Sequence, residues 1–323
     1  MKSPLPKVLH PVLGKPMVQY VIDTTRRAGA SEISVIIGFG KDILRQNLSG
    51  QQLQFVEQNQ QLGTGHAVQC FAKDIPRPPE HLLVVCGDTP LLSEVTLKAM
   101  IDLHFLERPA ATMITLDMAN PGGYGRILRN AQGKVQSIRE AKDCSEEEKN
   151  IREVNLAIYL FQGKALYDRL FKLSNTNRQQ EYYLTDIIEM LTRDSLTVLA
   201  VKEHDEESTL GINSRLDLAN VAGILRRRLL EQHMANGVAI LDPTQTWVEP
   251  DVQIGAETVI WPGTVLTGKT RIGAGCEIGP HVKLHDVETG DHVRASFCSL
   301  ETQIIPSETT VAPFSVRPSA KAS

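Results

Sequence analysis

The stretch IGAETV-IWPGTV-LTGKTR-IGAGCE-IGPHVK-L, residues 254–284, decides the fold of the C-terminal part of the chain. Aliphatic residues recur in it at a strict spacing of six, namely Ile254, Ile260, Leu266, Ile272, Ile278 and Leu284. This pattern predicts a left-handed parallel β-helix, in which each side of a triangular coil uses one hexad and turns one aliphatic side chain inward. The alternative is a β-sandwich with accidental spacing. Beyond Leu284 the phase of the repeat blurs, so we expect the β-helix to be incomplete.

Upstream of the hexads, helix-like and strand-like segments alternate. Met17, Val18, Val21 and Ile22 have the spacing of an amphipathic helix. Buried strands are predicted at residues 33–37, 81–86, 111–116, 154–160 and 197–201, and a hairpin at 126–138. Strands separated by helices predict an α/β domain with a doubly wound, mostly parallel, Rossmann-like sheet. We therefore expect this domain over residues 1–215, a linker helix within 216–248, and the β-helix over 249–318.

The composition excludes several classes of protein. With 323 residues and a formal net charge of −4, the chain gains no long-range attraction for nucleic acid, so we expect small-molecule substrates. No apolar run approaches the roughly 20 residues of a membrane span, and prolines interrupt the N-terminal segment, so no membrane association is predicted. The five cysteines are scattered, which fits free thiols in the cytoplasm better than a disulfide framework or a zinc site.

Asp88 is the strongest candidate for chemistry in the first domain. It follows Gly87 directly after a predicted buried strand, and in doubly wound sheets ligands bind at the C-terminal ends of strands. A carboxylate in that place suits a Mg²⁺ ligand in a phosphate site. The alternative is an Asx-turn or an N-cap residue, because Asp is common before turns that contain proline.

Several loops carry weaker signals. Gly63 and Thr64 lie in a tight loop that lets backbone approach a flat ligand, and the amide of Gln58 is able to pair with a base edge. Three glycines within four residues, the last of them Gly125, suit contact with a sugar or a phosphate. Each loop is equally compatible with a plain turn. The other candidates are Glu140 and Asn155, beside strands and able to bind a polyhydroxylated ring, and Asn213, which is alternatively an N-cap residue.

Taken in order, these segments strongly resemble the bacterial bifunctional N-acetylglucosamine-1-phosphate uridyltransferase/glucosamine-1-phosphate acetyltransferase family. The segments that carry the resemblance, ahead of the hexads, are PKVLHPVLGKPMVQYVID, EQNQQLGTGHAV, VVCGDTPLL, NPGGYGRILRNAQGKVQSIREAKD, EVNLAIYLF, EYYLTDII and GINSRLDLAN.

The resemblance implies transfer of a uridylyl group from UTP to N-acetylglucosamine 1-phosphate, giving UDP-N-acetylglucosamine and pyrophosphate for cell-wall precursors. It implies that Lys7 contacts phosphate and that Asp88 and Asn213 hold Mg²⁺. Gln58, Gly63 and Thr64 match uridine-binding positions, and Gly87, beside the metal ligand, is a further residue expected to bind substrate. Gly125, Glu140 and Asn155 match the sugar pocket. Family members trimerise through the β-helix, so a homotrimer is a further expectation.

Two departures from the family pattern leave alternatives open. The family begins with a strand and a glycine-rich loop that holds the triphosphate, and Met1 matches the last residue of that loop. The acetyltransferase site of the family lies in later coils, so we expect no acetyl transfer from a chain truncated at both ends. Whether this chain turns over is therefore open. The alternatives are a homologue that binds sugar nucleotide without turnover, and a nucleotidylyltransferase for another sugar phosphate.

Overall fold

A computed structural model describes residues 1–317, so residue 318, the last of the expected β-helix, lies outside the described residues. The chain forms two compact units. The first comprises Met1–His10 and Met17–Asn213, and the second comprises Pro11–Pro16 and the chain from Ser214 onward. The short antiparallel hairpin of β1 (Pro11–Val12) and β2 (Lys15–Pro16) thus belongs to the second unit. No helix within residues 1–317 is both long enough and apolar enough to cross a membrane.

The first unit alternates helices and strands, as its periodicity predicts. Its helices are α1 (Met17–Arg27), α2 (Lys41–Asn47), α3 (Thr64–Asp74), α4 (Glu94–Glu107), α5 (Gly163–Leu170) and α6 (Asp186–Arg193), with 3-10 turns at Lys7–Leu9, Glu148–Asn150 and Glu206–Thr209. Its strands are β3 (Ser34–Ile37), β4 (Gln54–Glu57), β5 (His81–Val84), β6 (Ala111–Asp117), β7 (Arg126–Arg129), β8 (Val135–Arg139), β9 (Glu153–Gln162) and β10 (Val198–Glu203).

The main sheet has the order β10-β6-β9-β7-β8, with β5 also paired to β9, while β3 and β4 form a separate parallel pair. β10 and β6 are parallel, and β7 and β8 form the expected hairpin. β9 is the exception to the mostly parallel expectation, since it runs antiparallel to β5, β6 and β7. Ala157 in β9 has a φ of 56°. A residue of that conformation within a strand marks a local bend, which lets the first half of β9 meet β7 and the second half meet β5.

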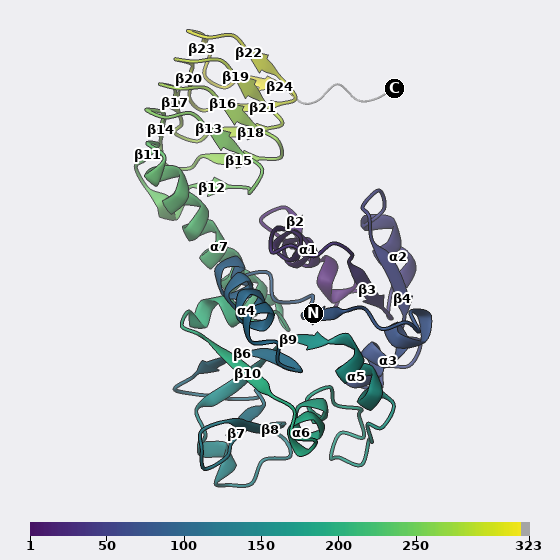
Figure 1. Cartoon of the computed structure of the whole chain (residues 1–323). Helices are drawn as coiled ribbons and strands as arrows, with labels where there is room; N and C mark the ends of the chain where they lie inside the picture. Colours follow the sequence, from purple (N-terminus) through teal and green to yellow (C-terminus); the bar gives the residue numbers. More distant parts are fainter. Residues whose placement is uncertain (318–323) are drawn as a thin grey trace. The chain divides into compact units, whose positions relative to one another are not determined.

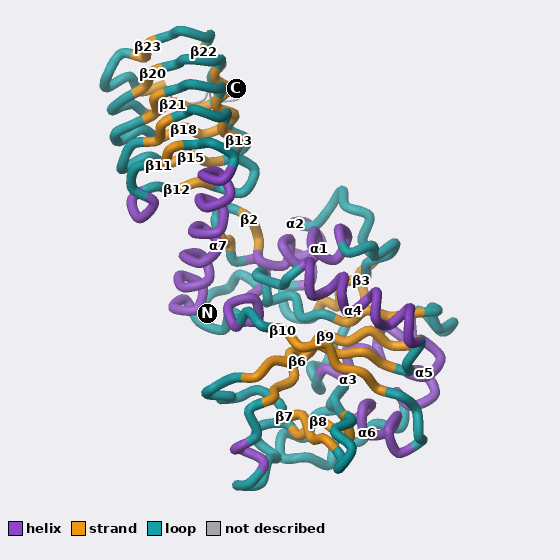
Figure 2. The backbone as a smooth tube through the Cα atoms, turned by 60° about the vertical axis from the view of Figure 1, so that its left-hand side comes forward, coloured by secondary structure: helices purple, strands orange, loops and turns teal. Residues whose placement is uncertain are grey.

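A hydrophobic cluster covers each face of this sheet, and successive residues of a strand pack alternately into one cluster and the other. In β6, Met113 packs into the core cluster that contains α3, α5 and α6, whereas Ile114 packs into the cluster on the other face with α1 and α4. In β9, Tyr159 and Ile158 divide in the same way. Successive strand residues point to opposite faces, so a continuous apolar run is what a sheet covered on both sides requires. Figure 2 shows these helices against the orange strands.

The second unit begins with α7 (Arg215–Ala235), close to the predicted linker helix. Its N-cap is Ser214, whose hydroxyl accepts from the Asp217 backbone N–H at 3.1 Å while the Asp217 carboxylate accepts from the Ser214 N–H at 2.8 Å. This reciprocal capping satisfies two backbone donors at the start of the helix.

The rest of the second unit is a left-handed parallel β-helix with three faces, visible as stacked short arrows in Figure 1. One face holds β11 (Ala239–Ile240), β14 (Val259–Ile260), β17 (Glu277–Ile278), β20 (Arg294–Ala295) and β23 (Thr310–Val311). The second holds β12 (Trp247–Val248), β15 (Val265–Thr267), β18 (Lys283–His285), β21 (Ser299–Glu301) and β24 (Val316–Arg317). The third holds β13 (Gln253–Ile254), β16 (Arg271–Ile272), β19 (Glu288–Thr289) and β22 (Ile304–Ile305).

The strand register confirms the hexads. Ile254 pairs with Ile272 and Ile260 pairs with Ile278, each three hexads further along the chain. Leu284 pairs with Leu300, so the coil between them is shorter than the coils before it. The shorter coil explains why the repeat loses its phase beyond Leu284 although the buried aliphatic column continues.

Candidate active site

Lys7, Asp88 and Asn213 converge in the first unit, as their proposed roles require. The Nζ atom of Lys7 lies 2.6 Å from Oδ2 of Asp88 and 2.7 Å from Oδ1 of Asn213. The side chains of Lys7 and Asp88 are 35% and 26% exposed. The three groups therefore meet at a surface that a small ligand is able to reach.

A turn after β5 sets the position of Asp88. The Thr89 hydroxyl donates to the carbonyl of Cys86 at 2.9 Å, and the Ile212 N–H donates to the backbone carbonyl of Asp88 at 3.1 Å. The second bond holds the Asn213 segment against the turn. Burial, followed by the nearby charge of Asp88, raises the pKa of the Cys86 thiol to about 12, so Cys86 stays protonated and is no nucleophile at neutral pH. Gly87 packs over Val18.

The donor set fits a magnesium ion. One carboxylate oxygen and one amide oxygen face a single cationic nitrogen, which marks a position where two oxygens and a positive charge meet. Mg²⁺ prefers such oxygen ligands and takes its remaining ligands from water and substrate phosphates. Within residues 1–317 there is no group of three or more His, Cys, Asp or Glu side chains that could hold a metal ion. A two-residue site completed by phosphate is consistent with that finding.

A second group consists of Gly125, directly before β7, Glu140, directly after β8, and Asn155 in β9. The Asn155 N–H donates to the Gly125 carbonyl at 2.9 Å, and a Cβ on Gly125 would lie 3.1 Å from Cγ2 of Ile138. Asn155 is 6% exposed, and its amide donates to the Tyr159 hydroxyl at 2.6 Å. Gly125 therefore leaves space that a side chain would fill, beside a fixed amide.

The Glu140 carboxylate accepts a hydrogen bond from the Thr185 hydroxyl at 3.0 Å. Burial is the largest influence on this group and raises its pKa. A cavity of about 430 Å³ opens beside it, lined also by Asp143, Tyr183 and Asp186. Desolvation, with the charges of Glu189 and Glu140, raises the pKa of Asp186 to about 6. The lining carries acidic and basic side chains, among them Arg139, Lys172 and Arg193, and a polar lining of this kind suits hydroxyl-rich ligands.

The glycine-rich loop that opens α3 carries the third group. The Gln58 amide nitrogen donates to the Gly63 carbonyl at 3.1 Å. Gly63 has a φ of 103°, and a Cβ there would lie 2.7 Å from the Tyr182 carbonyl oxygen. The Thr64 hydroxyl accepts from the Leu184 N–H at 3.1 Å, so Thr64 also holds the loop in place. Glycine is needed at position 63 both for the backbone conformation and for the close approach.

Residues 182–185 connect the loop to Glu140, and no residue of this segment is among the sequence candidates. Tyr182 and Leu184 contact the loop through their backbones, while Thr185 binds Glu140. The connecting segment EYYLTDII was available as a signal only through the resemblance. Tyr124 is also absent from the sequence candidates. Its hydroxyl donates to the Thr209 carbonyl at 3.2 Å. Burial is the main cause that raises the pKa of Tyr124, and the charge of Asp88 raises it further. Tyr124 thus lies between the Asp88 group and Gly125.

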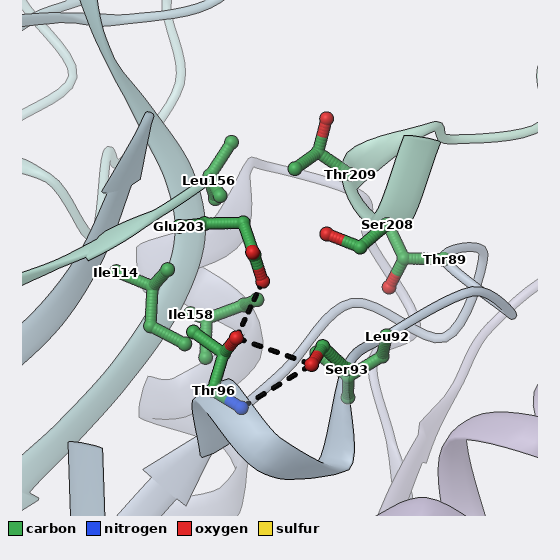
Figure 3. Close-up of a pocket in the computed structure, with 10 residues that line it drawn as sticks. All are labelled: Thr89, Leu92, Ser93, Thr96, Ile114, Leu156, Ile158, Glu203, Ser208 and Thr209. Carbon is green, nitrogen blue, oxygen red and sulfur yellow. Dashed lines mark hydrogen bonds between the residues drawn. The ribbon is translucent and has the colours of Figure 1, made fainter. Parts of the chain in front are cut away.

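Another pocket, about 10 Å³ in volume, is lined by Thr89 and Leu92 among others (Figure 3). Its acid is Glu203, 8% exposed, which accepts from the Thr96 hydroxyl at 2.6 Å. The backbone N–H groups of His204 and Asp205 also donate to the Glu203 carboxylate, at 2.8 and 3.0 Å. A carboxylate bonded in this way stabilises the fold, and the space suffices for about one water molecule.

The chain is similar to proteins of known families. A family model described as nucleotidyl transferase matches residues 3–248, and one described as bacterial transferase hexapeptide (six repeats) matches residues 251–286. A bifunctional protein GlmU from Geobacillus sp. (strain WCH70) is 43% identical over 322 residues, which cover 99% of this chain and 70% of that protein. A bifunctional protein GlmU from Clostridium acetobutylicum is 42% identical over 320 residues, covering 98% and 70%.

The crystal structure of a UDP-glucose pyrophosphorylase in complex with UDP-glucose resembles the chain with a TM-score of 0.57 and 16% identity. The match covers 69% of this chain and 91% of that one. At this identity the likeness concerns the fold alone.

Proposed function

The chain belongs to the GlmU family of nucleotidyltransferases, and from this premise we propose that its first unit makes UDP-N-acetylglucosamine and pyrophosphate from UTP and N-acetylglucosamine 1-phosphate. The product serves cell-wall precursor synthesis. The observation that carries the proposal is the convergence of Lys7 and Asp88 with Asn213 beside a turn at the end of β5. A cation and two oxygen ligands at one point suit the handling of a triphosphate.

In this reaction an oxygen of the sugar phosphate attacks the α-phosphorus of UTP, and pyrophosphate leaves in line. The protein's part is to position two anions and to offset their charge, because the phosphoryl groups themselves carry the bond changes. Lys7 supplies a positive charge to the phosphates. Asp88 and Asn213 would hold Mg²⁺, which neutralises phosphate oxygens when bound. Gly87 leaves the backbone beside Asp88 without a side chain.

The other two groups of residues supply recognition. Gln58, Gly63 and Thr64 form the loop that receives uracil. Gly125, Glu140 and Asn155 surround the N-acetylated sugar, with Thr185 orienting the Glu140 carboxylate. Because burial raises the pKa of Glu140, hydrogen bonds from sugar hydroxyls are a favourable replacement for the water it has lost.

Two other readings are less well supported. A nucleotidylyltransferase for glucose 1-phosphate fits the fold, but the identity to the GlmU relatives over nearly the whole chain favours the N-acetylated sugar. A binder without turnover would keep the same pocket, so only an assay separates it from an enzyme.

That assay is pyrophosphate release with Mg²⁺ and each pairing of UTP, CTP or dTTP with N-acetylglucosamine 1-phosphate or glucose 1-phosphate. We expect release with UTP and the N-acetylated sugar. Release with glucose 1-phosphate alone would contradict the sugar assignment. Tight binding of UDP-N-acetylglucosamine with no release for any pair would instead identify a binder.

The second unit is proposed to mediate self-association into a homotrimer. Large apolar side chains lie exposed on the β-helix, including Phe314 at 81% and Val316 at 71%. Exposed apolar surface of this kind is typical of interaction sites. Light scattering after size exclusion would give the mass of three chains, and the mass of one chain would contradict the proposal.

We place the protein in the cytoplasm, since its five cysteines are all free.

A further inference from the structure

Both hydrogens of the Gln58 side-chain amide have partners in the loop before and within α3. The nitrogen lies 3.1 Å from the Gly63 carbonyl oxygen and 3.1 Å from Nδ1 of His66. A carbonyl oxygen only accepts, so the nitrogen of the amide, and not its oxygen, faces Gly63. The orientation of the amide follows from this contact.

The same contact fixes the state of the His66 ring. Because the Gln58 nitrogen donates, Nδ1 of His66 accepts, and the ring proton sits on Nε2. Nε2 lies 3.8 Å from the sulfur of Cys70, one helical turn further along α3. Residues four apart on a helix lie on the same face, so the sulfur is placed to accept from that N–H. The His66 ring is therefore held between Gln58 and Cys70.

With both amide hydrogens used, the Gln58 side chain offers its oxygen, an acceptor, to a ligand. Uracil presents an N–H at N3, whereas cytosine presents an unprotonated acceptor at the same position. We infer that His66 is a specificity-determining residue, which holds the Gln58 amide so that the loop accepts uracil and rejects cytosine. The inference rests on the proposed role of Gln58 and Gly63 in binding the base.

The test compares His66→Leu with His66→Asn. Leucine removes the acceptor, so the Gln58 side-chain amide is free to flip by 180°. In the asparagine variant, Oδ1 accepts the Gln58 N–H close to the position of Nδ1. The ratio of kcat/KM for UTP to that for CTP should fall about tenfold in His66→Leu, the worth of one oriented hydrogen bond, and should stay within about twofold in His66→Asn. His204→Leu, the same change at an exposed histidine, is the matched control.

Thymine carries the same N3–H as uracil, so the ratio for UTP to dTTP should not change in His66→Leu. Calorimetric titration of UMP and CMP into each variant gives a readout that needs no turnover. An unchanged UTP-to-CTP ratio and unchanged UMP and CMP affinities in a folded His66→Leu protein would overturn the inference. Failure of the proposed function looks different, because the unmodified chain would then show no preference for uridine nucleotides in either measurement.

Discussion

The ammonium nitrogen of Lys7 lies 2.6 Å from the Asp88 carboxylate, and both side chains remain partly exposed. An exposed ion pair of this kind stabilises a fold little, so its closeness has to be explained by what the two groups do together. The Lys7 ammonium group lies beside Asp88, where a divalent cation and substrate phosphates are proposed to bind. We therefore propose that the pair serves function more than stability.

Replacing Asp88 by asparagine should abolish most turnover while leaving the fold intact. Asparagine keeps the size of the side chain but removes the charge that faces Lys7 and a metal ion. We expect kcat to fall by about 10²-fold or more, as measured by pyrophosphate release. Asp168→Asn removes a carboxylate from an exposed ion pair with Lys164 and should leave kcat unchanged. Equal activity of the two variants would refute the role of Asp88.

Gly63→Ala should raise KM for UTP as well as lower the free energy of unfolding. Alanine there is strained by the positive φ, and its Cβ meets the Tyr182 carbonyl. Gly50 also has a positive φ, of 78°, but nothing lies within 4 Å of an added Cβ. Gly50→Ala should therefore show only the conformational cost, about 1 kcal/mol in the free energy of unfolding, with KM for UTP unaltered. Only Gly63→Ala should raise KM for UTP; the idea fails if both variants raise it equally.

Asp186→Asn should stabilise the protein at pH 8 and not at pH 3. In the folded state the pKa of Asp186 is raised to about 6 from its ordinary value of 3.8, chiefly because burial disfavours its charge. The folded state therefore binds the proton more tightly, and stability is lost as the pH rises through the range between these values. Asparagine avoids this loss, so we expect a gain on the order of 1–2 kcal/mol at pH 8. Urea unfolding at several pH values checks it, with Asp102→Asn, the same change at an exposed position, as the control.

Arg126→Lys should loosen the glycine-rich segment beside the sugar pocket. Arg126 is 4% exposed and donates to the carbonyls of Tyr124 and Gly122. A lysine cannot reach both, so we expect a loss of about 1–3 kcal/mol in unfolding free energy and a higher KM for the sugar phosphate. Arg129→Lys, on the same strand, alters the pair with Glu153 and the bond to the Gly133 carbonyl but no bond to residues 122–125. Faster amide exchange at residues 122–125 in Arg126→Lys alone would support the clamp, and identical exchange in both variants would exclude it.

The periodic features were predictable from the sequence, and the tertiary pairings were not. The hexads place Ile254 and Leu266 on inward positions because the spacing itself encodes the coil. The position of Asp88 after a strand was predictable for the same kind of local reason, although β5 is only partly buried. The antiparallel course of β9 was not, since a buried strand reads the same in both directions.

Partners distant in sequence were equally hidden. Nothing near Glu140 points to Thr185, and nothing near Gln58 identifies His66 as its second acceptor. Such pairs depend on how separate elements pack, which a single sequence does not state.

The packing of residues 182–185 against both the loop and Glu140 has a consequence for the order of events. A nucleotide that immobilises the loop would also immobilise Thr185, which bonds to Glu140. Part of the conformational entropy that is lost when Glu140 becomes ordered would then be lost before the sugar phosphate binds. We therefore expect the second ligand to bind more tightly than it would bind to the free protein. Reciprocity requires the same factor whichever ligand comes first, so the two substrates should bind cooperatively.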